Sequence, residues 1–129
     1  MRKFTTQIVD AIRAKELVEE LIINDLPVLE QFELYLTGTT YLTEVRSLLT
    51  YIEHFANGGN IGKKCKILKG GNKKVTEYEF ISKHLRLYGI QMPGKKLIIY
   101  GGIKRQADSS DNITAFRLIC YEYLDTLNL

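Results

Sequence analysis

The sequence predicts an α+β domain with an opening strand, a helical hairpin of two or three helices, an antiparallel meander of three strands and a closing helix. Apolar residues recur every three to four positions through much of residues 10–56, which is the period of a buried helix face. β-rich runs separated by turn residues follow at 75–81, 85–91 and 97–103. The helical period returns after Ser110. Helices followed by a run of strands are typical of the α+β class.

The first elements are predicted from residues 4–23. Residues 4–9 indicate a short strand, because threonines and β-branched aliphatic residues share this stretch. Asp10 is the expected N-cap of a first helix, which runs to about residue 23. The apolar stripe of this helix has three- to four-residue spacing and consists of Ala14, Leu17, Val18, Leu21 and Ile22.

Two further helices are predicted before residue 60. The second begins at residues 25–27, since proline is tolerated in a first helical turn, and it stops at Gly38. The third restarts at Thr39 or Thr40 and ends at residues 57–59. The expected buried faces are Val28, Leu29, Phe32, Tyr35 and Leu36 in the second helix and Leu42, Val45, Leu48, Leu49, Ile52 and Phe55 in the third.

The second half is predicted to be mostly β-structure. A short strand-like run at 65–68 comes first, and residues 82–84 and 93–95 are natural reversals between the later runs. Residues 97–100 are continuously apolar, as expected for a strand covered on both faces. The closing helix runs over residues 110–127, with an inward face of Ile113, Phe116, Cys120, Tyr123, Leu124 and Leu127.

Length and composition limit the class of protein. A chain of 129 residues predicts a single domain spanning 1–129. No apolar run approaches the roughly 20 residues that span a bilayer, and the first residues lack the apolar stretch of a secretory signal. We therefore expect a cytoplasmic protein without membrane contact. Cys65 and Cys120 offer neither a disulfide framework nor a zinc-type spacing, so no metal or other cofactor is predicted.

Two catalytic motifs are excluded by their residues. Residues 60–64 superficially resemble a phosphate-binding loop, but Asn57 stands where glycine is required and Lys64 where Ser or Thr is required. No Gly-x-Ser-x-Gly nucleophile elbow occurs. The sequence therefore indicates neither a nucleotide-phosphate loop nor a serine hydrolase.

The charge of the chain is unevenly distributed. Residues 1–62 carry 5 Lys/Arg and 9 Asp/Glu, for a net charge of −4, whereas residues 63–129 carry 13 and 6, for a net charge of +7. Within 63–105, 12 basic residues stand against Glu77 and Glu79 alone. A basic sheet beside an acidic helical half predicts a surface that binds a polyanion, with nucleic acid as the first candidate. The alternative is that these cations are solvated edge residues that keep the sheet soluble.

The basic residues that start one strand and end the next are predicted to meet. In an antiparallel meander, the start of one strand lies beside the end of its partner. Arg86 is therefore expected beside Lys104 and Arg105, with Lys83 and His84 at the edge of the same patch. Clustered cations bind phosphate and stabilise the charge that develops on it during cleavage. A histidine beside them can act as an acid or a base.

Three further residues are candidates for RNA binding. Lys95 and Lys96 add positive charge at the turn before the last strand. The ring of Tyr88 offers a surface on which a base can stack, although core packing is the alternative for a strand aromatic.

Residues 78–106 resemble the RelE/ParE toxin superfamily, in particular its HigB-like branch. The run Leu-Arg-Leu-Tyr at 85–88 matches the family strand that carries an arginine before an apolar stretch and a tyrosine. The run Ile-Lys-Arg at 103–105 matches the family strand that ends in basic residues and leads into a terminal helix. The predicted order of an opening strand, helical hairpin, meander and terminal helix agrees with the family, apart from an extra helix in the N-terminal half.

The resemblance implies the toxin of a type II toxin–antitoxin pair with a RelE/ParE-like fold. RelE-like members cut mRNA on the ribosome without a metal ion, because the 2′-OH of the RNA attacks the adjacent phosphate and basic side chains stabilise the resulting charge. By position, Arg86 and Arg105 correspond to the two family arginines, and His84 is then expected to supply acid–base chemistry. The implied partners are a cognate antitoxin protein, the ribosome and its mRNA.

Besides that extra helix, two sets of residues depart from the family pattern, and they keep a second function open. Glu77 and Glu79 stand where RelE has strand lysines, and Asp111 stands where it has a tyrosine. These departures favour the alternative of a non-catalytic, ParE-like inhibitor of DNA gyrase, or of a toxin-fold module that binds nucleic acid or protein. The sequence does not choose between the two, and it does not indicate an oligomeric state.

Overall fold

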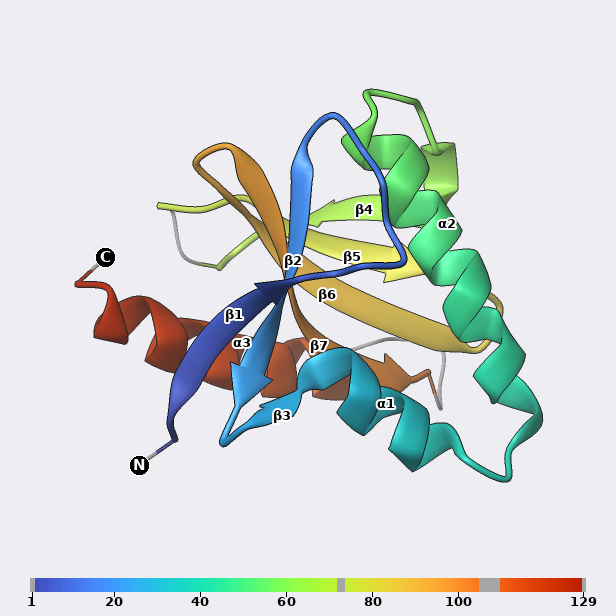
Figure 1. Cartoon of the computed structure of the whole chain (residues 1–129), viewed down its shortest axis with the longest axis horizontal. Helices are drawn as coiled ribbons and strands as arrows, with labels where there is room; N and C mark the ends of the chain where they lie inside the picture. The colour runs from blue at the N-terminus through green and yellow to red at the C-terminus, as the bar shows by residue number, and fades with distance from the viewer. Residues whose placement is uncertain (1, 72–73, 105–109, 129) are drawn as a thin grey trace.

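Seven strands form one mixed sheet in the computed structural model, which describes residues 2–71, 74–104 and 110–128 (Figure 1). The spatial order is β1-β2-β7-β6-β5-β4, and the short strand β3 pairs with β2. β2 and β7 pair in parallel, and the other pairs are antiparallel. The strands are β1 Phe4–Ile8, β2 Leu17–Ile23, β3 Leu26–Pro27, β4 Cys65–Leu68, β5 Glu77–Ile81, β6 Leu85–Met92 and β7 Lys95–Ile103.

The helices cover both faces of this sheet. Phe55 packs edge-on against Phe80 of β5, whereas Phe116 stacks on Tyr88 of β6. Because Phe80 alternates along its strand with Glu79, the cross-strand partner of Tyr88, the two helices concerned lie on opposite faces. Figure 1 shows these helices, α2 and α3, on different sides of the molecule. The helical elements are α1 Val28–Leu36, the 3₁₀ turn η1 Thr40–Thr43, α2 Glu44–Ala56, the 3₁₀ turn η2 Gly62–Lys64 and α3 Ser110–Thr126.

α1 shares the α2 face of the sheet. The buried ring of Phe32 lies so close to Gly101 of β7 that a Cβ there would be 2.6 Å from the ring and 2.9 Å from Leu87. Apolar side chains on both faces therefore form the core, with the sheet between them. The largest fully buried side chains of this core are those of Tyr88, Phe80, Phe116, Leu21, Leu36, Leu48, Ile52, Leu85, Leu87, Ile90, Leu97 and Ile98.

The predicted architecture is wrong in its N-terminal part and in the extent of the sheet. Residues 17–23 form β2 instead of the second half of a helix. β2 pairs with β1 on one side and with Lys95–Ile98 of β7 on the other. The predicted three-stranded meander, β5 to β7, is consequently the middle of a seven-stranded mixed sheet.

Glu20 shows why the helical interpretation of this segment fails. A helix with the predicted stripe would expose Glu20, but its side chain lies in the sheet and is 6% exposed. Its Oε1 accepts the backbone N–H of Leu29 at 3.0 Å, in the first turn of α1, and its Oε2 accepts Nε2 of Gln7 at 3.1 Å. Pairing with β1 and β7, together with this helix cap, is a set of tertiary interactions that override a local helical period.

The remaining elements lie close to their predicted ranges. α1 starts directly after Pro27, and Gly38 has a φ of 85°, the left-handed conformation in which glycine ends a helix. α2 begins at Glu44, because a 3₁₀ turn takes up the residues before it. Tyr35 and Leu42, predicted to be buried, are 55% and 38% exposed. Among the described residues, no helix is both long and apolar enough to cross a membrane.

Candidate nucleic-acid interface

At one end of the sheet, basic residues lie in or directly next to the ends of three strands. β6 begins and β7 ends there: Arg86 lies opposite Gly102, and the carbonyl of the residue before β6 accepts the backbone N–H of Lys104 at 2.9 Å. β4 begins at the same end, since Cys65 lies opposite Phe80 near the end of β5. We call this group the basic sheet end; its described members are Lys63, Lys64, Lys83, His84, Arg86 and Lys104.

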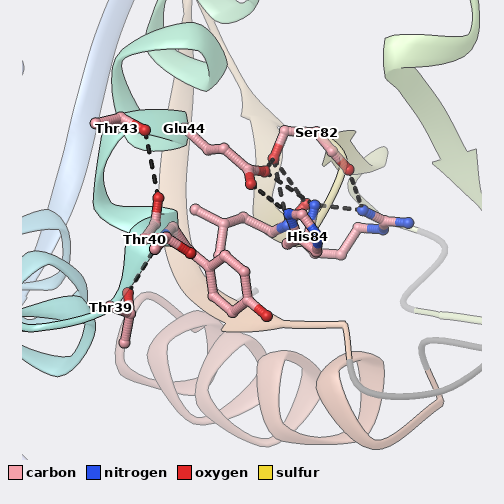
Figure 2. Close-up of polar contacts among 9 residues, drawn as sticks. Thr39, Thr40, Thr43, Glu44, Ser82 and His84 are labelled. Atoms are coloured by element: carbon pink, nitrogen blue, oxygen red, sulfur yellow. Dashed lines mark hydrogen bonds and ion pairs between the residues drawn. The ribbon is translucent and has the colours of Figure 1, made fainter.

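His84 is held in place by a carboxylate at the start of α2 (Figure 2). Its Nδ1 lies 2.6 Å from Oε2 of Glu44, and its backbone N–H donates to Oε1 at 2.9 Å. Ser82 donates its hydroxyl to the same Oε1 at 2.6 Å. The ring of Tyr41 stacks on the imidazole, with centroids 4.4 Å apart. His84 is therefore oriented by contacts on two sides, while its side chain stays 37% exposed.

The Glu44 carboxylate favours the tautomer of His84 that carries its proton on Nδ1. Burial acts to raise the pKa of Glu44, but the hydrogen bonds from Ser82 and His84 and the charge of His84 outweigh it and lower the pKa below its ordinary 4.5. An ionised Glu44 accepts a hydrogen bond from the Nδ1–H of His84, which leaves Nε2 as the ring nitrogen for acid–base chemistry.

Arg86 is a buried cation at the same end of the sheet. The residue is 6% exposed, and its Nη1 donates to the backbone carbonyls of Ser82 at 2.6 Å and Leu85 at 2.8 Å. Its Nε is buried without a hydrogen-bond partner. Among the described residues, no carboxylate pairs with this guanidinium. A buried charge without a counter-charge is costly, so the arrangement favours an anion as the missing partner.

Lys95 and Lys96 lie at the other end of β7 and are paired with acidic residues of the first half. Nζ of Lys95 donates to Glu19 at 2.6 Å, and Nζ of Lys96 donates to Glu16 and, at 2.9 Å, to Gln91. Burial acts to raise the pKa of Glu16, but its bonds with Lys96 and Gln91 and the Lys96 charge lower it. The structure therefore does not bring these lysines to the predicted RNA-binding patch, and their charge is balanced within the chain.

Tyr88 has no surface that a base could reach. Its side chain is 0% exposed, its ring stacks on Phe116 with centroids 5.2 Å apart, and its hydroxyl donates to Glu79 at 2.7 Å. The alternative of core packing is therefore correct for this ring.

Glu77 and Glu79 face α3 and have structural partners. Nε and Nη2 of Arg117 donate to Oε1 of Glu77 at 3.0 and 2.9 Å, and Nη2 also donates to the carbonyl of Lys69. Glu77 is 2% and Glu79 4% exposed. Glu77 thus attaches α3 to β5 through Arg117, whereas Glu79 accepts the hydroxyl of Tyr88 on the neighbouring strand β6. Both carboxylates are buried and do not lie on the basic surface.

The other predicted site residues divide into two groups. Lys83 is exposed and Lys104 is half-buried, both at the basic sheet end. Arg105 lies outside the described residues. Sequence reasoning did not single out Lys63 and Lys64, which are exposed and lie at the same end of the sheet because β4 is antiparallel to β5. Nζ of Lys64 lies 4.5 Å from the ring centroid of Tyr51 on α2. In the sequence these two lysines stand directly before a strand-like run. Their position at this end of the sheet depends on the pairing of β4 with β5, which the sequence does not reveal.

Two other chemistries have little basis in the described residues. Within residues 2–71, 74–104 and 110–128, no three His, Cys, Asp or Glu side chains are grouped so as to hold a metal ion. Burial raises the pKa of the Cys65 thiol to about 11 and that of Cys120 to about 12. Neither cysteine is therefore a reactive thiolate near neutral pH.

The fold and this site together define a mixed α+β protein with a basic sheet end and a carboxylate-oriented histidine. Comparison with known proteins gives no match to a family model, to a curated protein or to a solved structure.

Proposed function

We propose that this chain is the toxin of a type II toxin–antitoxin pair and that it cuts mRNA on the ribosome in the cytoplasm. The observation that carries the proposal is Arg86, a buried cation with no carboxylate partner among the described residues, hydrogen-bonded through Ser82 to the Glu44–His84 pair. Phosphate is the anion that a guanidinium in a basic surface binds well. The sequence resemblance to RelE-like toxins supports the same substrate.

The proposed reaction uses groups of the RNA and of the basic sheet end. The 2′-oxygen attacks the adjacent phosphorus and loses its proton to a base. The bond from phosphorus to the 5′-oxygen then breaks, and that oxygen takes up a proton, which leaves a 2′,3′-cyclic phosphate and a 5′-hydroxyl. His84 exchanges protons through Nε2, and Arg86 stabilises the negative charge on the phosphoryl oxygens. Lys104 and Lys83 bind the flanking phosphates, and Arg105 keeps the role that the resemblance implies.

The test is cleavage of mRNA by the purified chain on translating ribosomes, read by mapping the 5′ ends of the fragments. Arg86→Gln is expected to lower the cleavage rate by about 100-fold or more, which is the usual effect of losing one donor to a developing oxyanion. The matched control is Arg46→Gln, which removes an equal charge from an exposed position on α2. An Arg86→Gln variant that folds and cleaves like the unchanged chain would contradict the proposal.

A second candidate is a non-catalytic protein of the same toxin class, such as an inhibitor of DNA gyrase. It is favoured by Glu77 and Glu79, which stand in place of the RelE lysines and are fixed by Arg117 and Tyr88. A supercoiling assay separates the two: a ribosome-dependent nuclease leaves gyrase unaffected, whereas a gyrase inhibitor blocks supercoiling and leaves mRNA intact. In either case a cognate antitoxin is the proposed protein partner.

A further inference from the structure

The second half of β7 has an open edge. β2 pairs with β7 only from Lys95 to Ile98, after which β2 diverges and the chain reverses at Asn24 and Asp25, both with positive φ. From Tyr100 to Ile103, β7 pairs with β6 on one side, and a register shift between Tyr88 and Gly89 leaves Ile99 without a paired residue. Within the described residues no strand lies on the other side.

The register gives the direction of the backbone groups at this edge. The N–H of Lys104 donates to the carbonyl of His84, so these residues form a hydrogen-bonded antiparallel pair. Hydrogen-bonded and non-hydrogen-bonded pairs alternate, so Ile103 and Gly101 belong to the non-bonded pairs. Their N–H and C=O groups therefore point away from β6. Nδ2 of Asn112 donates to one of them, the carbonyl of Ile103, at 3.1 Å.

A groove of about 690 Å³ follows this edge. Ile99–Ile103 line it together with residues of α1, among them Phe32 and Tyr35, and residues of α3, among them Asp111 and Ile119. Since α1 and α3 lie on opposite faces of the sheet, the strand edge lies between two helical walls. The edge carries neither lysine nor proline, which commonly protect an open strand, whereas the edge strand β4 carries Lys66.

We propose that this groove binds an extended segment of a partner protein, which adds to β7 as a further strand. Outward N–H and C=O groups on alternate residues match the backbone of a strand and provide most of the affinity in this mode of recognition. A second copy of the chain is a poor fit, because its own β7 edge is recessed between the same two helices. The inference does not depend on the proposed RNA cleavage.

Side chains of the groove define the chemistry of the segment. Alternate residues of an added strand point toward α1 and toward α3, so apolar residues meet the Phe32 ring on one side and Ile119 on the other. Asp111 is exposed in the first turn of α3, whereas Arg2 is already paired with Glu122 at 2.6 Å. Among the described residues that line the groove, the charge without an ion-pair partner is therefore negative, and it selects a basic residue in the partner segment.

The test uses a displayed library of random 12-residue peptides, selected on the full chain. Selected peptides are expected to show alternating apolar residues and a basic residue, and to slow hydrogen exchange of the Gly101 and Ile103 amides at least tenfold. Ile103→Pro removes an outward N–H without breaking a bond to β6, and Ile103→Val is its matched control. The proline variant is expected to bind about threefold to tenfold more weakly than the valine variant, the range of one hydrogen bond.

A second measurement needs no protein variant. N-methylation of the selected peptide on the residues that face β7 is expected to abolish binding, whereas methylation on the intervening residues leaves binding unchanged. The inference is wrong if no selected peptide protects Gly101 and Ile103. It is also wrong if both methylation patterns bind equally.

Discussion

The buried ion pair between Glu77 and Arg117 provides a strong test of how α3 is attached to the sheet. Two nitrogens of Arg117 donate to one carboxylate oxygen, at 3.0 and 2.9 Å, and the Glu77 side chain is 1% exposed. The second oxygen, Oε2, is buried without a partner. Arg117→Met keeps most of the side-chain volume but leaves this carboxylate buried without a counter-charge.

The loss of stability expected for Arg117→Met follows from the burial of Glu77. Removing one partner of a buried ion pair costs about 3–5 kcal/mol, because the other charge stays desolvated. For a domain of this size the cost corresponds to a fall in Tm of about 10–20 °C. By contrast, Arg2→Met removes an ion pair whose side chains are 44% and 38% exposed, and it should cost about 1 kcal/mol or less.

Urea denaturation followed by far-UV circular dichroism measures both variants. The double variant Glu77→Gln with Arg117→Met is expected to be more stable than Arg117→Met alone, because it no longer buries an unpaired charge. If Arg117→Met costs no more than Arg2→Met, or if the double variant is less stable than Arg117→Met, the assigned role of the Glu77 pair is refuted.

Three further predictions concern packing, pH and thiol reactivity. Gly101→Ala places a Cβ 2.6 Å from the Phe32 ring and should cost about 1–3 kcal/mol in urea denaturation; an unchanged midpoint would contradict the close packing of α1. Because the pKa of Glu44 is lowered below 4.5 in the folded state, the unfolded state binds more protons, and stability falls as the pH drops through this range. Glu44→Gln should make that fall shallower, and an identical pH profile would argue against the His84 contact. With pKa values of about 11 and 12, Cys65 and Cys120 should alkylate at least about tenfold more slowly at pH 8 in the folded chain than in urea, and equal rates would show that the thiols are not buried.

Local signals in the sequence placed several elements correctly. Pro27 and Gly38 bracket α1 because each imposes a backbone conformation that the neighbouring residues do not change. The turn residues after Ile81 and Met92 separate β5, β6 and β7 close to the predicted positions. The ends of α1 and the turns between these strands depend on a few adjacent residues, so they can be predicted from a single sequence.

β2 could not be predicted in the same way. Its apolar residues fit a helical stripe as well as a strand, and the choice is made by β1, by β7 and by the Glu20 cap on α1. β7 is about 78 residues away in the sequence, and β1 and Leu29 lie beyond the span of a single local period. The fold prediction failed at the element whose structure is determined by pairing and not by local propensity.

The same limit applies to the candidate site. The approach of Arg86 to Lys104 followed from antiparallel pairing of neighbouring strands, which a meander pattern displays. The pairing of Lys95 and Lys96 with Glu19 and Glu16 follows from the parallel β2–β7 contact, which the sequence did not indicate. The contrast between an acidic first half and a basic second half is therefore partly a set of ion pairs that hold the two halves together.

The central claim is that Arg86 binds an RNA phosphate, and its ¹H–¹⁵N Nε resonance tests this most directly. The ligand is a short 2′-O-methyl RNA, which cannot be cut by attack of its own 2′-oxygen. We predict that the Arg86 signal shifts on titration and returns when salt is raised, while the Arg117 signal stays in place because Glu77 already holds it. RNA binding that moves lysine signals of the basic sheet end but leaves Arg86 unchanged would contradict the claim.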